Sequence, residues 1–253
     1  MIRYFSDRPY AVAVVGAGSG IGRAAAAYLA GQGVMVGCLD RDAPANAASA
    51  QAITAAGGTA FAHGVDVTDE ATIGPALDAV ARAFGRLDGL VNCAGITGLT
   101  NRKAHDVDLA DFDRVYRINL RGAMALSIAV LPRMLERGYG RVLHVASIAG
   151  KEGNAGMAAY SATKAGLIGL VKSMAKDYAT TGITINALAP AVIQTPMVDA
   201  LPAAQVTYMT DKIPMRRCGT LDEVAQIIAW IVSPACSFTT GFTFDLSGGR
   251  ATY

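Results

Sequence analysis

Tyr160 and Lys164 have the spacing best suited to chemistry in this chain of 253 residues. They lie four positions apart in a helical pattern, so their side chains share one helix face. A tyrosine with a pKa of about 10 is a poor base at neutral pH, and a nearby ammonium favours the phenolate. Ser147 ends the preceding strand pattern and is placed to hold a substrate oxygen. Together they predict acid–base catalysis coupled to hydride transfer.

A second pair, Tyr208 and Lys212, has the same spacing, and Thr195 stands at the matching offset for a hydroxyl. The pair alone is therefore not specific. This second pair lies in a loop-rich segment at about 197–217, which is better suited to a mobile substrate lid. Ser147, by contrast, ends a strand, where ligands bind in doubly wound sheets.

A glycine-rich turn, GAGSGIG at 16–22, joins an apolar run at 11–15 to a helical pattern at about 20–30. Without a Cβ, the backbone can approach a pyrophosphate, and the helix N-terminus presents free N–H groups. A simple glycine-rich turn is the alternative, but the strand before and the helix after match a dinucleotide site. The predicted contacts are Gly16, Ser19, Gly20 and Ile21.

Asp40, at the end of the second strand pattern, is predicted to determine whether NAD or NADP binds. A carboxylate there can accept hydrogen bonds from both ribose hydroxyls, and it repels a 2′-phosphate. Arg41 is the opposing signal, because a guanidinium can bind a 2′-phosphate. Asp40 lies nearer the strand end, so we expect NAD rather than NADP; the alternative is a surface aspartate without a ligand.

Two further strand ends are expected to contact the cofactor. Asp66 and Val67 follow the third strand and are placed to frame the adenine, with a helix cap as the alternative. Asn92 begins the NCAG motif after the fourth strand and is expected to lock that strand end by hydrogen bonds. Ala94 and Gly95 leave room for the cofactor, and a simple turn is the alternative.

In their order, these motifs resemble the short-chain dehydrogenase/reductase family from Ala11 to Gly249. The matching segments are GAGSGIG at 16–22, NCAG at 92–95, Asn119, Ser147, YSATK at 160–164 and the region of Pro190. Several motifs in the right order are far more specific than any one of them.

The resemblance implies a catalytic tetrad. Tyr160 is then the general acid/base and Lys164 lowers its pKa. Ser147 orients the substrate oxygen, and Asn119 holds a water that links Lys164 to solvent. A polar residue that kinks a helix is the alternative for Asn119. The resemblance also implies contacts to the nicotinamide carboxamide from Pro190, Ile193 and Thr195.

Two positions depart from the family pattern. Val15 stands where a threonine usually precedes the first glycine, which removes one hydroxyl hydrogen bond from the turn. Ala191 stands where a glycine usually follows Pro190, so a methyl group narrows the space beside the nicotinamide. Neither change touches the residues that transfer the proton.

Short β-rich runs alternate with longer helical patterns along the whole chain. This order predicts an α/β fold: one doubly wound parallel sheet, a Rossmann fold, with helices on both faces. We expect a single domain over 1–253. The predicted strands are 11–15, 34–39, a segment ending at 65–66, 87–91, 141–146, 183–188 and 241–246. The predicted helices are 20–30, 43–56, 69–84, 111–137, 157–179 and 221–232.

Composition narrows the class of protein. Hydrophobic residues make up 52% and charged residues 17%, which is enough apolar material for a substantial core. The net charge is +2 without a basic run, so nucleic acid is not an expected partner. No segment is typical of a signal peptide or a membrane span. The four cysteines are scattered, so we expect no disulfide, no metal site and a cytoplasmic protein.

The substrate is predicted from the loop between Ser147 and Tyr160. Lys151 and Asn154 there, with Gln194, can bind a carboxylate and hydroxyls, although a solvated loop is the alternative. The segments GKEGN at 150–154 and SGGRATY at 247–253 resemble those of bacterial family members acting on sugar acids, particularly 2-keto-3-deoxy acids.

Two other functions compete with an NAD-dependent alcohol dehydrogenase. An NADPH-dependent reductase of 3-oxoacyl thioesters would share the fold and the tetrad, but Asp40 argues against a 2′-phosphate. A catalytically inactive, cofactor-binding regulator would lack tetrad residues, and all four are present. The family resemblance further implies a homotetramer.

Overall fold

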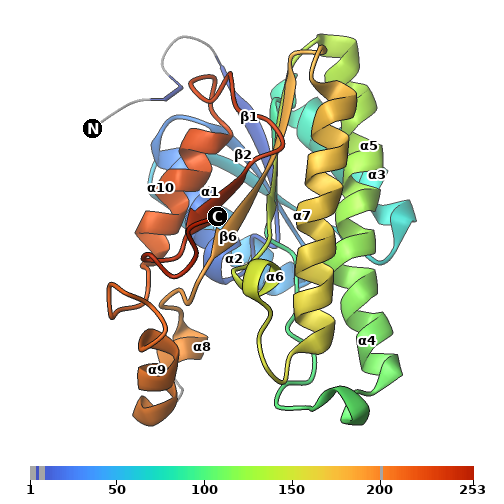
Figure 1. The fold of residues 1–253 in the computed structure, drawn as a ribbon. Helices are drawn as coiled ribbons and strands as arrows, with labels where there is room; N and C mark the ends of the chain where they lie inside the picture. The colour runs from blue at the N-terminus through green and yellow to red at the C-terminus, as the bar shows by residue number, and fades with distance from the viewer. Residues whose placement is uncertain (1–3, 6–8, 200–201) are drawn as a thin grey trace.

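Seven parallel strands form one sheet in the computed structural model, which describes residues 4–5, 9–199 and 202–253 (Figure 1). The strands are β1 (Ala11–Val15), β2 (Met35–Asp40), β3 (Thr59–Gly64), β4 (Gly89–Asn92), β5 (Gly140–Val145), β6 (Ile183–Pro190) and β7 (Thr243–Leu246). Their order is β3-β2-β1-β4-β5-β6-β7. The order reverses between β1 and β4, and ligands bind at the carboxyl ends of strands beside such a reversal.

Helices cover both faces of the sheet (Figure 1). One face packs against α1 (Gly20–Gly31), α2 (Ala43–Ala55) and α10 (Leu221–Ile231), and the other against α3 (Glu70–Phe84), α5 (Gly122–Arg137) and α7 (Ala158–Tyr178). The predicted doubly wound α/β fold is confirmed. Shorter elements are η1 (Ala104–Asp106), α4 (Leu109–Tyr116), η2 (Arg117–Arg121), α6 (Ala149–Glu152), α8 (Pro196–Asp199) and α9 (Ala203–Thr210).

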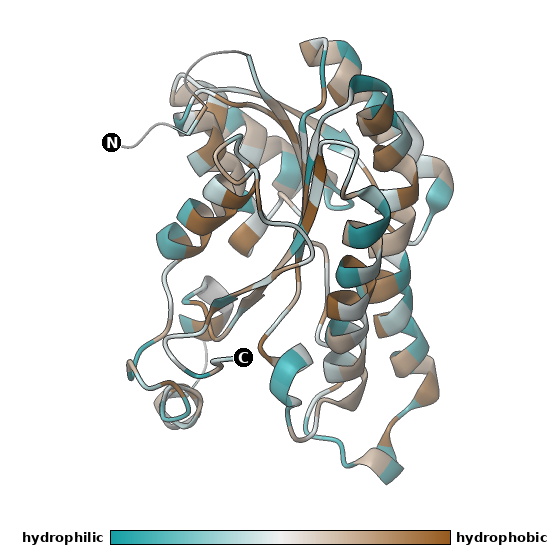
Figure 2. Ribbon diagram, turned by 45° about the horizontal axis from the view of Figure 1, so that its top comes forward, coloured by the Kyte–Doolittle hydropathy of each residue, from teal (hydrophilic) through white to brown (hydrophobic). Residues whose placement is uncertain are grey.

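The core lies in two layers, one on each side of the sheet. Every residue of β1, β5 and β6 is buried, as expected for parallel strands covered on both faces. Hydrophobic residues follow the central strands, and hydrophilic residues gather on the outer helix surfaces and loops (Figure 2). This rigid core presents the strand ends that carry the predicted site residues.

The predicted helix at 111–137 is present, but it contains a π-helical turn. It consists of α4, the π-helical turn η2 and α5, with Asn119 inside the π turn. Such a turn inserts one extra residue into an otherwise α-helical segment, and the sequence analysis did not predict it. The four-residue helices α6 and α8 and the eight-residue α9 are too short to show a periodicity. Within the predicted lid, residues 200–201 lie outside the described residues.

The segment Leu109–Arg137 is, within the described part of the chain, the one helix long and apolar enough to cross a membrane. Half of its most apolar window, 50%, is buried inside the protein. That burial is typical of a core helix, and α5 packs through Leu126, Val130 and Met134 against the sheet.

The glycine turn depends on a close approach that tolerates no side chain. A Cβ at Gly22 would lie 2.1 Å from the carbonyl oxygen of Gly16, which is backbone and cannot move aside. We expect Gly22→Ala to lower the free energy of unfolding by at least about 2 kcal/mol, measured by urea denaturation. Gly31→Ala is the control, because its Cβ meets nothing within 4 Å. It should be neutral or stabilise the protein by about 0.5 kcal/mol. Equal effects of the two changes would contradict this account.

Candidate active site

A pocket of about 510 Å³ opens at the carboxyl ends of the strands and brings together most of the predicted site residues. Its volume is in the range of small-molecule and cofactor sites. The predicted residues that line it are Gly16, Ser19, Gly20, Ile21, Asp40, Arg41, Asp66, Val67, Ala94, Gly95, Ser147, Tyr160, Lys164, Pro190, Ile193 and Thr195. Asn92, Asn119, Lys151, Asn154 and Gln194 are not among the residues that line it.

Asp40 holds the glycine turn in place as well as facing the pocket. Its Oδ2 accepts a hydrogen bond from the Gly18 amide at 2.8 Å, and its Oδ1 accepts one from the Asp42 amide at 2.9 Å. A Cβ at Gly18 would lie 2.9 Å from Oδ2, so only glycine fits there without displacement. The Gly16 amide donates to the carbonyl of Leu39 at 2.8 Å. These bonds tie the turn to β2 even though Val15 replaces the family's threonine.

The residues of this region fit a dinucleotide. Each carboxylate oxygen can accept a second hydrogen bond, so Asp40 can still receive ribose hydroxyls. Ser19 and Gly20 begin α1, whose free N–H groups favour a pyrophosphate. Arg41 is exposed and lines the same pocket beside Asp40. Both signals recognised in the sequence, the carboxylate and the neighbouring guanidinium, therefore lie at one end of the pocket.

Asp66 does not cap the next helix. Its Oδ1 accepts hydrogen bonds from the Thr68 amide at 2.8 Å and the Thr68 hydroxyl at 2.7 Å. These bonds, with a smaller contribution from the Arg41 guanidinium, lower the pKa of Asp66. Asp69 caps α3 instead, accepting from the Ala71 amide. Asp66 and Val67 thus form a turn on the wall of the pocket.

Asn92 lies beneath the pocket in a buried chain of hydrogen bonds. Its Oδ1 accepts from the Ala94 amide at 3.1 Å, which locks the strand end as the sequence predicts. Its amide nitrogen lies 3.1 Å from Nδ1 of His144 and can only donate, so Nδ1 accepts. His144 Nε2 then carries the proton and donates to Ser127 Oγ at 3.0 Å. The Ser127 hydroxyl donates to the carbonyl of Ala123 at 2.9 Å.

Asn119 clamps the backbone beside the catalytic residues. Its Oδ1 accepts from the Ile96 amide and its Nδ2 donates to the Ile96 carbonyl, both at 2.9 Å. Nδ2 also lies 3.3 Å from the Thr163 hydroxyl. The π turn η2 directs this side chain inward, and Asn119 is 1% exposed. Asn119 therefore joins α4–α5, α7 and the loop after β4, and the water-holding role stays a prediction.

Ser147, Tyr160 and Lys164 meet at the inner end of the pocket. Ser147 Oγ accepts from the Ala149 amide at 3.1 Å, which fixes its side chain just after β5. Lys164 is 4% exposed, and its Nζ donates to the carbonyl of Val145 at 2.7 Å. The same Nζ lies 5.7 Å from the centre of the Tyr160 ring. The shared helix face predicted from the spacing is present in α7.

The expected lowering of the Tyr160 pKa by Lys164 stays a prediction, and burial is the larger influence on both groups. Burial raises the pKa of Tyr160, and a hydrogen bond with Ser147 lowers it only in part. Burial also lowers the pKa of Lys164 to about 8. Removal from water disfavours the charged form of each group, the phenolate of Tyr160 and the ammonium of Lys164. The sequence showed the spacing of the pair but not the depth at which both groups lie.

Three of the four predicted substrate contacts, all except Ser147, bind to other parts of the protein. Lys151 forms an ion pair with Asp245 at 2.8 Å, and Asn154 accepts a hydrogen bond from Arg250 at 3.0 Å. Gln194 donates a hydrogen bond to Asp199. Asp245 and Arg250 belong to the C-terminal part of the chain, and the sequence analysis missed both. No local signal indicates these bonds, because their partners lie 94 and 96 positions apart along the chain.

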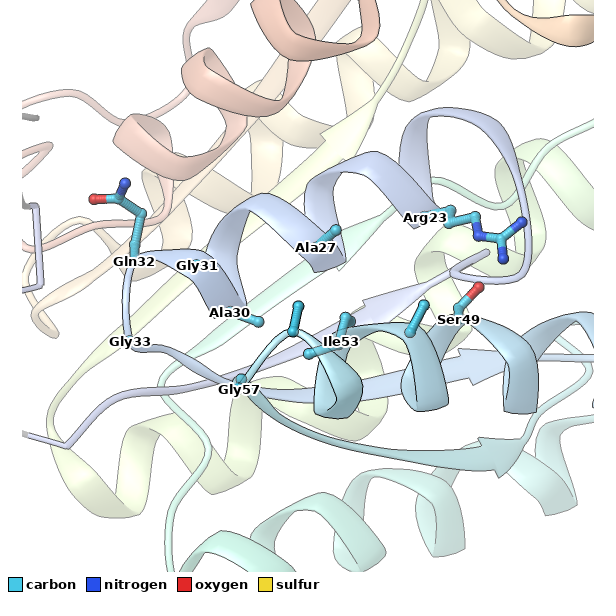
Figure 3. A pocket seen from close by; sticks show the side chains of 12 residues that line it. Arg23, Ala27, Ala30, Gly31, Gln32, Gly33, Ser49, Ile53 and Gly57 are labelled. Carbon is cyan, nitrogen blue, oxygen red and sulfur yellow. The ribbon is translucent and has the colours of Figure 1, made fainter.

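A second pocket, of about 490 Å³, lies between α1 and α2 on the outside of the sheet (Figure 3). Small side chains and glycines line most of it, and Ala30 and Ile53 face each other across it. Arg23 and Ser49 lie at one end, whereas the Gln32 side chain points away from α2. It contains none of the residues predicted to carry chemistry, so the candidate active site is the pocket at the strand ends.

Comparison with known proteins agrees with this geometry. A family model described as enoyl-(acyl carrier protein) reductase, which covers short-chain dehydrogenases and reductases, matches residues 16–251. The 2-dehydro-3-deoxy-L-rhamnonate dehydrogenase (NAD(+)) of Sphingomonas sp. (strain SKA58) is 44% identical over 95% of this chain and 94% of that protein.

Two crystal structures are similar over almost their whole length. Levodione reductase gives a TM-score of 0.91 at 34% identity, covering 96% of this chain and 98% of that one. Actinorhodin polyketide ketoreductase with NADPH gives a TM-score of 0.91 at 30% identity, covering 97% and 98%. These relatives are oxidoreductases, and their names include both NAD and NADPH.

The buried chain through His144 predicts a pH-dependent stability. Burial, with a smaller contribution from Lys164, lowers the pKa of His144 from 6.5 to about 4. The folded protein keeps His144 neutral, while the unfolded chain binds a proton. The contribution of His144 to the free energy of unfolding is therefore fully present above pH 6.5 and is lost as the pH falls to 4. Relative to His144→Asn, the wild type should lose up to about 1.4 kcal/mol per pH unit in this window. Urea denaturation at several pH values measures this, and a pH-independent difference would contradict a neutral His144.

Proposed function

We propose, because this chain belongs to the short-chain dehydrogenase/reductase family, that it is an NAD-dependent dehydrogenase of a sugar acid such as a 2-keto-3-deoxy acid. It interconverts a secondary alcohol and a ketone on that substrate. The observation that carries the proposal is the meeting of Ser147, Tyr160 and Lys164 in the pocket whose far end holds Asp40.

The proton follows a short path through this chain's own side chains. A bound nicotinamide supplies the acceptor or donor of the hydride. The Ser147 hydroxyl, fixed by the Ala149 amide, orients the substrate oxygen. The Tyr160 phenolate takes the hydroxyl proton in oxidation, and the phenol returns it in reduction. Lys164, from the same helix face, holds the ribose beside the nicotinamide and favours the phenolate when both are charged.

The protonation state of Tyr160 decides whether ketone reduction or alcohol oxidation is catalysed faster at a given pH. Since burial raises this pKa, the phenol dominates at neutral pH and is ready to protonate a ketone. Oxidation of an alcohol needs the phenolate, so its rate rises toward alkaline pH. The Ser147 hydrogen bond lowers the pKa and partly offsets burial.

The preference for NAD rests on Asp40. Its carboxylate sits where the ribose of the adenosine half would bind and opposes a 2′-phosphate. The relative from Sphingomonas is named as an NAD(+) enzyme. The exposed Arg41 beside it is the observation that favours the alternative, an NADPH-dependent reductase of 3-oxoacyl thioesters. The choice of a sugar acid rests on the name of the same relative and on its 44% identity.

We propose that the chain acts as one domain with a lid near 197–217, and that it assembles as a homotetramer in the cytoplasm. The four cysteines are free thiols, as suits a reducing compartment. Met124, Ile128 and Leu135 form an exposed apolar face on α5, and Phe238 and Phe242 are exposed beside β7. Apolar faces of this kind support contacts between subunits.

Tyr160→Phe tests the proposed reaction. NADH formation is followed at alkaline pH with 2-dehydro-3-deoxy-L-rhamnonate, a free aldose, a 3-hydroxyacyl thioester and an apolar secondary alcohol. We expect turnover of the sugar acid with NAD, and a fall in kcat of about 10²- to 10⁴-fold in the variant because no proton acceptor remains. Tyr116→Phe, an exposed change on α4, is the control. Turnover of only the thioester or the apolar alcohol would show that the sugar-acid proposal is wrong.

Asp40→Asn tests the choice of cofactor. Removing the negative charge should lower kcat/KM for NAD about 10-fold or more and raise the ratio of NADP to NAD turnover. Asp42→Asn is a matched control, since asparagine caps α2 as well as aspartate does. An unchanged ratio of NADP to NAD turnover in Asp40→Asn would assign cofactor choice to another residue.

A further inference from the structure

An acid substrate needs a cation near the site, and the loop before Tyr160 offers Lys151. The Lys151 ammonium donates to both oxygens of Asp245, at 3.0 and 2.8 Å. Its side chain is 9% exposed and lies under the Tyr253 ring, with Nζ 4.9 Å from the ring centre. The charge of Lys151 is therefore neutralised and covered, so the carboxylate must be recognised by another group.

The C-terminal segment 247–253 brings Arg250 to the same loop. Arg250 donates from Nε to Glu152 at 2.8 Å and from Nη2 to Asn154 at 3.0 Å. Asn154 is joined in turn to α7, because its amide donates to Ser161 Oγ at 3.0 Å. Within the described residues no hydrogen bond involves Nη1 of Arg250, so this donor remains for a ligand.

Lys212 approaches from the lid side. Its Nζ donates to the Tyr208 hydroxyl at 2.8 Å, and it forms no salt bridge with any carboxylate in the described part of the chain. The segment after α9 packs on the C-terminal segment: the Met215 amide donates to the Gly248 carbonyl at 3.1 Å. The hydrogen bond and charge of Lys212, with the charge of Arg250, lower the pKa of the Tyr208 phenol. Both cations thus act on one side chain of the lid.

The charges around this junction leave one cation in excess. Lys151 is balanced by Asp245, and Arg250 by Glu152, while Lys212 is balanced by no acidic residue. An ammonium and a guanidinium with free donors suit the two oxygens of a carboxylate. We propose that Lys212 and the free Nη1 of Arg250 bind the carboxylate of the substrate.

This inference rests on the proposed function, since it identifies the residues that recognise the acid. The experiment compares 2-dehydro-3-deoxy-L-rhamnonate with its methyl ester in the full-length enzyme. Lys212→Met and Arg250→Gln should each raise KM for the acid about 10- to 100-fold, because a charged hydrogen bond is lost. KM for the ester and kcat for both substrates should stay within about 3-fold, so the preference for the acid disappears.

Matched variants separate recognition from folding. Lys176→Met removes an exposed lysine from α7 and should leave both KM values unchanged. Arg250→Lys keeps the charge and the bond to Glu152, and should keep most of the preference for the acid. If Arg250→Gln unfolds the enzyme, Arg250→Lys and Lys212→Met, which changes an exposed residue, still test the proposal.

The outcomes distinguish the two proposals. If the wild type oxidises the acid but Lys212→Met and the Arg250 variants keep its KM, the recognition by these cations is wrong and the sugar-acid function stands. If the wild type shows no preference for the acid over the ester, the inference is overturned before any variant is made. If the wild type uses neither and oxidises another alcohol, the proposed function fails as well.

Discussion

A buried ammonium organises the site. Lys164 is 4% exposed, and its partner is the carbonyl of Val145 at 2.7 Å. Moving a cation out of water is costly, and one carbonyl offsets that cost only in part, which is why the pKa of Lys164 falls to about 8. The charge stays there because α7 is held against the sheet by residues such as Leu167 and Val171. That packing also places Tyr160, one turn earlier, beside Ser147.

The residues around Lys164 leave space for its backbone and its ammonium group. A Cβ at Gly150 would lie 2.6 Å from the Lys164 backbone carbon, and one at Gly95 would lie 3.3 Å from Nζ. Side chains at either position would press on the helix or on the ammonium. Burial, and to a smaller extent the charge of Lys164, lowers the pKa of His144 below it, so this imidazole stays neutral at neutral pH. Residues after β4 and β5 are therefore constrained by a single charge on α7.

The features that could be predicted from the sequence are those whose signals are local. The glycine turn, Asp40 and the Tyr160–Lys164 spacing each depend on neighbours within one turn or one strand end, and the structure places them in one pocket. The hydrogen bonds of the Asn119 side chain to Ile96 could not be predicted, because they join residues 23 positions apart. The rise in the pKa of Tyr160 was equally invisible, since burial is a property of the packed fold.

The same limit explains why the sequence could not show that the charge of Lys151, a predicted substrate contact, is paired within the protein. Lys151 pairs with a residue 94 positions away and Glu152 with one 98 positions away, so no local pattern could show which charges are satisfied. From the sequence alone Lys151 and Lys212 are equivalent cations, and only the fold pairs one of them with a carboxylate. Lys151 joins α6 to β7 through its ion pair with Asp245, which is largely removed from water. In our proposal, recognition of the acid falls to Lys212, which forms no salt bridge in the described part of the chain, and to the free Nη1 of Arg250.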